Sequence, residues 1–432
     1  MQFLKSSNIN NKTISKYLSK HLPDYKPLKK TSINTEIIVV IPVYKEKQYI
    51  FKTIDSLLLC ERPEKDVEVI LLFNASENDS EVIRNEQKSV AEAIRKKYCM
   101  QDDNWLSFIV EERYNIIKKH FGAGMARKAG MDIALARLFS IGKNEGLIVT
   151  LDADTLVQPN YFKAISDWFE NPEKIGASIY FEHPLEGDDF PPEIYEGITK
   201  YELHLRYYMQ AWRETGFPYA FHTMGSAMAM RASAYARIGG MPRKQAGEDF
   251  YFLQKLIPLG GFGEITDTKI IPSPRPSDRV IFGTGAAIKN LMSGNNNINY
   301  TYNYQAFTDL KEFFSIRSQF FRIPKSEFEK LCNNLSKPLQ KFLLETNFYN
   351  DLNTLQTNCS NIQTFNKRFW EIFNAFKVVK YLNFVHEHHF KKISVLEAGL
   401  TYLEKNNHST VGLTTEKNVL EYFRKMETVV LN

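Results

Sequence analysis

Short apolar runs rich in β-branched residues alternate along the first part of the chain with longer stretches whose apolar residues recur at helical spacing. The apolar runs are residues 36–44, 67–73, 105–110 and 146–151. The helical stretches that follow them are residues 49–59, 80–98, 123–139 and 160–170, with Ser80 as an expected N-cap. Such strand–helix repeats predict an α/β fold with a doubly wound, mostly parallel, Rossmann-like sheet. The nearly continuous apolar run at 36–44 is typical of a strand covered on both faces.

Two aspartates close the fourth apolar run, in the string LDADT. Ligands of doubly wound sheets bind beyond the carboxyl ends of the strands, which is where Asp152 and Asp154 are expected. Residues two apart in an extended segment face the same side, and two unit charges ~4 Å apart repel by about 4 kcal/mol at an effective dielectric constant of ~20. We therefore expect a positive group here, namely Mg²⁺ or Mn²⁺, which take oxygen ligands and bridge to phosphates. The alternative, acids favoured near a helix N-terminus, explains one aspartate but not both.

The character of the chain changes near residue 290. The polar segment 293–305 is a predicted boundary, and the residues beyond it are rich in Lys, Phe, Leu and Asn at helical spacing, with aromatic stripes typical of core packing. We expect three parts: a basic N-terminal extension at residues 1–35, an α/β domain at 36–290 and an α-helical C-terminal region at 291–432. The lysines of the first part indicate a solvated, partly disordered arm, with contact to an anionic membrane surface as the alternative.

Composition narrows the class of protein. The chain has 432 residues, 43% of them hydrophobic, enough for a large domain and a smaller one. Its 55 Lys and Arg against 50 Asp and Glu leave a net charge of +5, without the clustered basic face of a nucleic-acid-binding protein. The four cysteines share no CxxC spacing, which indicates reduced thiols rather than a zinc site or disulfides. With no signal peptide and no run approaching ~18 apolar residues, we expect a cytoplasmic protein without a transmembrane segment, with peripheral contact at the inner face of the membrane as an option.

Four segments, in order along the chain, resemble the inverting family 2 glycosyltransferases. They are IIVVIPVYKEKQYIFKTIDSLL, GAGMARKAGMDIAL, LIVTLDADTLVQPNYF and GSAMAMRASAYARIGGMPRKQAGEDFYFLQKL. The resemblance covers residues 36 to roughly 285 and implies a catalytic domain of the GT-A fold, a nucleotide-sugar-binding α/β sheet. It also implies a DxD motif, in which Asp152 contacts ribose and metal and Asp154 is the principal metal ligand.

The resemblance extends to the residues that line the nucleotide sugar. Those after the first strand are Pro42, Tyr44 and Glu46. In GAGMARKAG, the glycines let backbone approach a ligand closely, Gly124 among them, and Arg127 and Lys128 are expected to meet phosphate or ribose oxygens. A glycine-rich helix start with a solvated base is the alternative, and it has more weight for Lys128 than for Arg127.

The adjacent acids Glu248 and Asp249 follow a flexible-looking segment, GGMPRKQAG, and begin a predicted helix. Inverting transfer needs one base, within hydrogen-bond reach, to take the proton from the acceptor hydroxyl as it attacks the anomeric carbon. The expected transition state is oxocarbenium-like, as in glycoside hydrolysis. By resemblance, Asp249 is the base, and Glu248 binds the acceptor or positions Asp249. The alternative is that both acids only complement the helix dipole.

Two further sets of residues are weaker candidates. Arg275 and Arg279 lie in the Pro- and Gly-rich loop 270–285, which suits a lid over a diphosphate, with a solvated loop as the alternative. His222 and His183 are candidates for a further metal ligand, although a lone histidine is more often structural.

The second strand departs from the family pattern. The family has an acidic run there, with an aspartate that reads uracil, whereas this chain has FNASEND at residues 73–79. Asn74 or Asp79 is expected to replace that contact, so uridine is not assured as the donor base, and guanosine and thymidine sugars stay open.

The sequence therefore predicts a metal-dependent glycosyltransferase that moves a sugar from a nucleotide-diphosphate sugar to an acceptor hydroxyl, with inversion and with Mn²⁺ or Mg²⁺ as cofactor. The acceptor class stays open between a saccharide, a lipid-linked saccharide and a small molecule. Three alternatives are a retaining transferase of the same fold, a phosphatase of the haloacid dehalogenase type and a non-catalytic nucleotide-sugar-binding protein. LDADTLV also resembles the phosphatase nucleophile loop, but that loop normally follows the first strand of its domain, and three strand–helix units precede it here.

Overall fold

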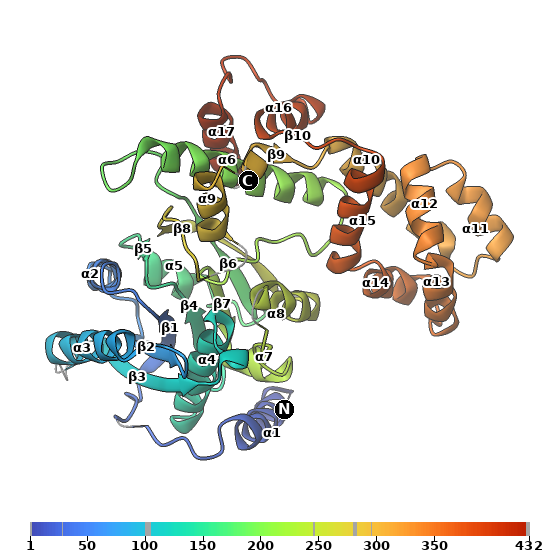
Figure 1. Cartoon of the computed structure of the whole chain (residues 1–432). Helices are drawn as coiled ribbons and strands as arrows, with labels where there is room; N and C mark the ends of the chain where they lie inside the picture. The colour runs from blue at the N-terminus through green and yellow to red at the C-terminus, as the bar shows by residue number, and fades with distance from the viewer. Residues whose placement is uncertain are drawn as a thin grey trace. The chain divides into compact units, whose positions relative to one another are not determined.

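The computed structural model describes residues 2–27, 29–99, 105–244, 247–279, 283–294 and 296–428. The chain forms two compact units (Figure 1). The first unit consists of Met1–Phe190 and Phe221–Lys289, and the second of Pro191–Ala220 and Asn290–Asn432. The long helix α6 (Pro192–Glu214) therefore belongs to the second unit, although it lies between two parts of the first in the sequence.

The first unit is built on a sheet of eight strands among the described residues. They are β1 (Thr35–Val43), β2 (Asp66–Ser76), β3 (Leu106–Ile116), β4 (Leu147–Thr150), β5 (Thr155–Val157), β6 (Gly176–Phe181), β7 (Met228–Arg231) and β8 (Phe262–Pro272). Their order is β3-β2-β1-β4-β7-β6-β8-β5. Strands β3, β2, β1 and β4 run parallel, as do β6 and β8, whereas β7 is antiparallel to both its neighbours and β5 is antiparallel to β8. The predicted α/β fold with a mostly parallel sheet is confirmed.

The helices between the parallel strands arise from the predicted amphipathic stretches. They are α2 (Ile50–Leu58), α3 (Glu81–Tyr98), α4 (Ala123–Ser140) and α5 (Tyr161–Trp168). The N-cap is confirmed, because Ser80 Oγ accepts a hydrogen bond from the Ile83 amide at 3.4 Å. Helix α4 packs closely on β1, since a Cβ atom at Gly130 would lie 2.3 Å from Val40 Cγ1. Further elements of this unit are η1 (Lys118–His120), α7 (Ala232–Arg237), α8 (Glu248–Leu256) and η2 (Ile257–Leu259). Helix α9 (Thr284–Met292) runs across the boundary at Lys289, and η3 (Asn296–Asn299) belongs to the second unit.

The strand order reverses its direction between β1 and β4. From β1 the chain winds outward to β2 and β3, then returns through α4 to β4 on the other side of β1. At such a reversal the loops after the two central strands diverge, and a crevice opens beyond their carboxyl ends. The loop after β1 carries Tyr44 and Glu46, and the loop after β4 carries Asp152 and Asp154.

The interpretation of the N-terminal residues as a solvated, partly disordered arm is wrong over helix α1 (Gln2–His21). Ile14 and Tyr17 are buried, and α1 packs against α7 and α4 in the first unit (Figure 1). Apolar burial overrides the basic character of this segment, because Lys12, Lys16 and Lys20 lie between the apolar positions and stay exposed.

The second unit is helical, as predicted for the C-terminal region. Besides α6 it contains α10 (Tyr304–Ser315), η4 (Arg317–Phe320), α11 (Lys325–Cys332), α12 (Lys337–Glu345), α13 (Phe348–Thr357), α14 (Ile362–Ile372), α15 (Ala375–His388), α16 (Val395–Lys405) and α17 (Glu416–Thr428), with two short antiparallel strands, β9 (Tyr300–Thr301) and β10 (Ile393–Ser394). The aromatic stripes are core packing, as predicted. The buried Phe313 ring lies with its centroid 5.2 Å from Phe373 and 5.5 Å from Phe348.

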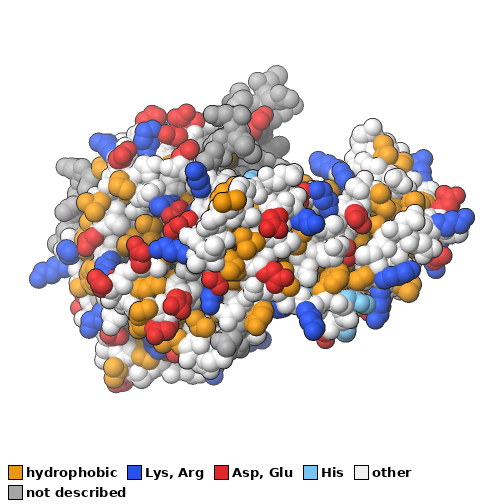
Figure 2. Space-filling view, turned by 90° about the horizontal axis from the view of Figure 1, so that it is seen from above, with side chains coloured by type: hydrophobic (Ala, Val, Ile, Leu, Met, Phe, Trp, Pro, Cys, Tyr) orange, Lys and Arg blue, Asp and Glu red, His pale blue; other side chains and the backbone are white. Residues whose placement is uncertain are grey.

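Acidic and basic side chains are mixed over the described part of the face in Figure 2, as the small net charge leads one to expect. Among the described residues, no helix combines the length and the apolar character needed to cross a bilayer.

Candidate active site

The aspartates after β4 lie on a firmly held turn. Leu151 and Ala153 point inward and are buried, whereas 42% of the Asp152 side chain is exposed, so the residues alternate as in a strand. Thr53 Oγ1 of α2 donates a hydrogen bond to the Ala153 carbonyl at 2.8 Å, and the Thr155 amide donates to the Asp152 carbonyl at 3.2 Å. These bonds fix the backbone, so the two carboxylates project from a rigid support.

Arg127 of α4 joins the first of these carboxylates to α8. It is buried, with 4% exposed, and its Nη2 donates to Asp152 Oδ1 at 3.0 Å while its Nη1 donates to Glu248 Oε1 at 2.5 Å. Two glycines make room for this arrangement. A Cβ atom at Gly225 would lie 2.6 Å from the guanidinium carbon, and one at Gly124 would lie 2.7 Å from Glu248 Cγ. The fork of Arg127 thus holds two acidic residues at a fixed separation.

The second aspartate has an arginine partner as well. Arg275 Nε donates to Asp154 Oδ2 at 2.5 Å, and Arg275 Nη2 donates to both oxygens of Glu46, at 2.6 and 2.7 Å. Arg279 Nη1 reaches Glu46 Oε1 at 2.5 Å, and the Arg275 guanidinium lies 4.3 Å from the centre of the Tyr49 ring.

Burial raises the pKa values of Asp154 and Glu46. Repulsion from Asp152 adds to the shift of Asp154 and repulsion from Asp154 to that of Glu46, whereas the arginines oppose both shifts. Each of the two aspartates thus has a positively charged partner: Arg127 for Asp152 and Arg275 for Asp154.

Glu248 and Asp249 begin helix α8, as predicted. Asp249 Oδ1 accepts a hydrogen bond from the Phe250 amide at 2.8 Å. Burial raises the pKa of Asp249 to about 6, with nearby Arg127 lowering it and Glu248 raising it. A carboxylate with a pKa in this range is suited to general base catalysis near neutral pH. Residues 245–246 of the predicted flexible segment lie outside the described residues.

The nucleotide-side candidates lie at the ends of β1 and β2. Pro42 is the penultimate residue of β1 and pairs with Leu72. The Tyr44 hydroxyl donates to Asp79 Oδ1 at 2.8 Å, which joins the two loops. Asn74 is buried, and its Oδ1 has no hydrogen-bond partner among the described residues. A buried acceptor of this kind carries a desolvation penalty unless a ligand or water satisfies it.

The structure does not bring every predicted residue into this cluster. Lys128 turns away from it, and its Nζ donates to Asp132 Oδ2 and to the Tyr17 hydroxyl, both at 2.8 Å. His222 packs edge-on against Phe181, with ring centroids 5.2 Å apart. His183 Nε2 lies 3.2 Å from Thr284 Oγ1.

Within the described part of the chain, no group of three or more His, Cys, Asp or Glu residues is placed to hold a metal by protein ligands alone. Residues 280–282 of the predicted lid loop lie outside the description.

The sequence interpretation did not foresee the pairing within the site. Arg127 and Glu248 are 121 residues apart, and Arg275 and Glu46 are 229 apart. Gly225 was part of a quoted motif, but its contact with Arg127 has no local signal. Only the acidic character of LDADT pointed to the need for nearby cations.

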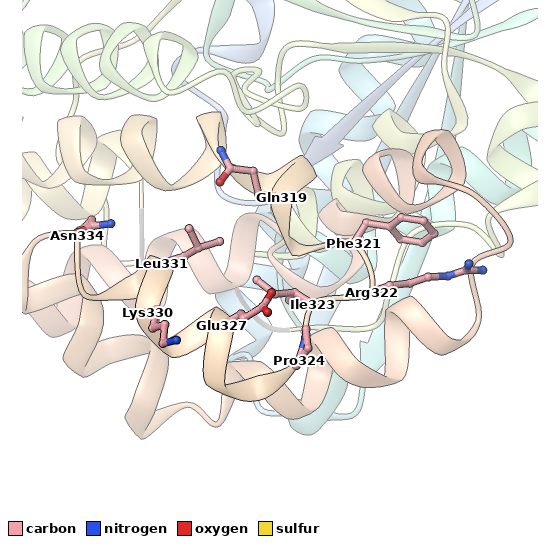
Figure 3. A pocket seen from close by; sticks show the side chains of 9 residues that line it. All are labelled: Gln319, Phe321, Arg322, Ile323, Pro324, Glu327, Lys330, Leu331 and Asn334. Atoms are coloured by element: carbon pink, nitrogen blue, oxygen red, sulfur yellow. The ribbon is translucent and has the colours of Figure 1, made fainter.

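A separate pocket of about 470 Å³ lies in the second unit (Figure 3). Its wall combines a hydrophobic part with polar and charged side chains: Gln319, Phe321, Arg322, Ile323, Pro324, Glu327, Lys330, Leu331 and Asn334. None of the candidate residues named above lines it.

Comparison with known proteins gives one family match and several similar solved structures. A family model described as glycosyl transferase family 2 matches residues 38–239. No curated protein sequence matches the chain. Among solved structures, the chain is similar to residues 1–349 of S. aureus TarS in complex with UDP-GlcNAc, with 14% identity, a TM-score of 0.42 and coverage of 78% of this chain and 92% of that one. It is also similar to the mannosyltransferase PcManGT from Pyrobaculum calidifontis in complex with GDP-Man and Mn²⁺, with 12% identity, a TM-score of 0.33 and coverage of 99% and 95%.

The family match contains part of the site. It includes Glu46, Arg127, Asp152 and Asp154 and ends before Glu248.

Proposed function

The chain is a glycosyltransferase whose family 2 domain spans residues 38–239, and from this premise we propose that it transfers a sugar from a nucleotide-diphosphate donor to an acceptor hydroxyl with inversion and with the help of a divalent cation. The observation that carries the proposal is a pair of ion-pair clusters formed by residues that follow β1 and β4. In one cluster Arg127 holds Asp152 and Glu248, the neighbour of Asp249. In the other, Arg275 holds Asp154 and Glu46.

The residues at the strand ends suit Mn²⁺ or Mg²⁺. Such ions need only one or two protein carboxylates when a substrate diphosphate and water complete the coordination. The site has an excess of acid, because its five carboxylates outnumber its three arginines: Glu46, Asp152, Asp154, Glu248 and Asp249 against Arg127, Arg275 and Arg279. Asp154 and the partly exposed Asp152 are the ligands in this proposal. The ion supplies charge stabilisation for the departing diphosphate.

The chain's own residues supply the remaining chemistry. Asp249 takes the proton from the acceptor hydroxyl as that oxygen attacks the anomeric carbon, and its raised pKa keeps it a usable base. Glu248 is held by Arg127 and positions Asp249 at the start of α8. Arg275 and Arg279 donate hydrogen bonds to diphosphate oxygens of the donor, and the buried Asn74 Oδ1 accepts one from its base.

Direct assay of transfer tests this function. Uridine, guanosine and thymidine diphosphate sugars are incubated with Mn²⁺, the full chain and saccharide or lipid-linked saccharide acceptors. Release of nucleoside diphosphate is then measured, and the anomeric configuration of the product is read by NMR. We expect inversion, and we expect Asp154→Ala and Asp249→Asn each to lower turnover by about 10²-fold or more, because each removes a group that acts in the transition state.

Asp167→Asn is the matched control. Asp167 forms an exposed i,i+4 pair with Lys163 and should be replaceable without loss of turnover. Turnover near that of the unmodified chain in either site variant contradicts the assignment, and retention of configuration contradicts the role of Asp249.

A further inference from the structure

Helix α1 precedes the family 2 domain, yet its Tyr17 side chain reaches the supports of the candidate active site. Only 6% of Tyr17 is exposed. Its hydroxyl donates to Asp132 Oδ1 at 2.7 Å and accepts from Lys128 Nζ at 2.8 Å. Lys128 and Asp132 lie one turn apart in α4 and bond to each other, so Tyr17 completes a buried three-membered network with that helix.

This network lies directly behind the arginine of the site. Lys128 follows Arg127 in α4, and Arg127 holds Asp152 and Glu248. The Tyr235 hydroxyl of α7 donates to Asp132 Oδ1 at 2.6 Å, so one buried carboxylate ties α1, α4 and α7 together. A displacement of α4 at this point would move the Arg127 fork relative to both of its acidic partners.

Tyr17 also contacts the segment that leads to the base. Gly240, just after α7, has a φ of +69°, and a Cβ atom there would lie 1.9 Å from the Tyr17 hydroxyl oxygen. The hydroxyl therefore rests on the backbone of a turn from which the chain runs on to Glu248 and Asp249. A single oxygen atom thus contacts both the helix that carries Arg127 and the turn at Gly240.

We propose that Tyr17 is a positioning residue for glycosyl transfer: its hydroxyl keeps α4 in register with the turn at Gly240, so that Arg127 holds Glu248, and with it the neighbouring Asp249, in the working geometry. The inference rests on the function proposed above. It makes α1 a part of the catalytic apparatus, although α1 lies outside the family match. Displacement of reacting groups by ~1 Å from a distant change can cost about 10²-fold in rate, which is why one remote hydroxyl has a measurable effect.

The test compares Tyr17→Phe with Tyr25→Phe. Tyr25 belongs to the same N-terminal segment, and its hydroxyl donates to Glu111 Oε1 at 2.9 Å. It accepts at 3.5 Å from Arg137 Nη1, nine residues beyond Lys128 in α4, and not from Lys128 itself. Both changes remove one hydroxyl from a half-buried or buried ring and leave the ring in place. We expect Tyr17→Phe to lower kcat by about tenfold with the donor KM within about twofold, and Tyr25→Phe to leave both constants within about twofold of the unmodified chain.

A second measurement does not depend on the substrate. In the donor-free full chain, hydrogen exchange of the amides at residues 248–256 should be about tenfold faster in Tyr17→Phe and unchanged in Tyr25→Phe. The inference is overturned if Tyr17→Phe keeps its kcat, if Tyr25→Phe shows the same loss, or if exchange in α8 is the same in both variants. Absence of transfer by the unmodified chain with every donor would instead contradict the proposed function, and the exchange experiment would still decide whether Tyr17 positions α8.

Discussion

Two opposing influences set the pKa of the Asp249 carboxyl. Burial of the side chain favours the protonated form, and the nearby guanidinium of Arg127 favours the carboxylate, which leaves the pKa at about 6. Because the native pKa lies above the ordinary value of 3.8, the folded state binds this proton more tightly than the unfolded state. The stabilisation from the protonated carboxyl is complete below the ordinary value and is lost as the pH rises through about 6. Asp249 therefore opposes folding under the conditions in which it acts as a base.

A pH profile reveals this base. As pH falls below about 6, kcat/KM should decrease by about tenfold per pH unit, since only the carboxylate accepts the proton. The profile is measured with saturating Mn²⁺ at constant ionic strength. The residual activity of Asp249→Asn should show no such limb, and a limb near pH 4 in the unmodified chain would contradict the role of Asp249.

Two glycines of α4 offer a second prediction at the level of single residues. A Cβ atom at Gly124 would lie 2.7 Å from Glu248 Cγ and 2.8 Å from the Lys244 carbonyl oxygen, whereas the three atoms nearest to one at Gly130 belong to Val40 of β1. Both alanine variants overpack the interior and should lose about 1–3 kcal/mol of unfolding free energy. Only Gly124→Ala should also lower kcat of the folded protein, by displacing Glu248.

The glycine comparison needs unfolding curves and kinetics on the same samples. Loss of kcat in Gly130→Ala at a temperature where it is fully folded would show that overpacking of α4 in general, and not displacement of Glu248, impairs transfer. Equal kcat in Gly124→Ala and the unmodified chain would show that Glu248 can move without consequence.

Among the elements, the parallel half of the sheet was predictable from the sequence and the antiparallel half was not. Strands β1, β2, β3 and β4 are recognisable from their apolar runs and from the amphipathic helices between them, which are local signals. Strands β5 and β7 are three and four residues long and have no periodicity to detect. The same reasoning found Asp152 and Asp154 at a strand end, but it could not pair Arg275 with Glu46, because that contact joins the segments after β8 and β1, between which three strands lie in the sheet. Helix α1 was missed because its lysines outweighed its few apolar positions.

A buried ion-pair cluster joins two helices of the second unit. Arg206 of α6 is fully buried and bonds to Glu202 of the same helix and to Glu427 of α17, and Arg424 of α17 bonds to both oxygens of Glu202. Arg206→Ala would remove one guanidinium from two buried acids, Glu202 and Glu427, and should cost about 3–5 kcal/mol. The hydrogen exchange rates of the α17 amides measure this loss of stability in the helix that carries Glu427.

Lys341→Ala is the control for the cluster. Lys341 forms an exposed i,i+4 pair with Glu345 at 3.8 Å, and its removal should cost less than about 1 kcal/mol. If exchange in α17 responds equally to both variants, the cluster does not hold α17 on α6.

For the whole molecule, donor binding should raise the free energy of unfolding. A ligand at 100 times its Kd adds about 2.7 kcal/mol to the free energy of unfolding when it binds only the native state. We expect Mn²⁺ and a true donor sugar nucleotide to raise the unfolding temperature together, and Asp154→Ala to remove the part that depends on Mn²⁺. Thermal unfolding of both proteins with donor alone, Mn²⁺ alone and the two combined measures this. An undiminished Mn²⁺ increment in Asp154→Ala would place the cation elsewhere.

The arginine already bound to Asp154 has a consequence for the sequence of events at the strand ends. A cation that binds without donor must break the hydrogen bond between Arg275 and Asp154. A cation that binds together with the donor is accompanied by diphosphate oxygens, which can accept the hydrogen bond of Arg275 in place of Asp154. Mn²⁺ alone should therefore bind weakly, and Mn²⁺ and donor should each raise the affinity of the protein for the other by the same factor. Calorimetric titration of Mn²⁺ with and without donor would expose this reciprocity, and equal affinities in the two titrations would rule out such an exchange of partners.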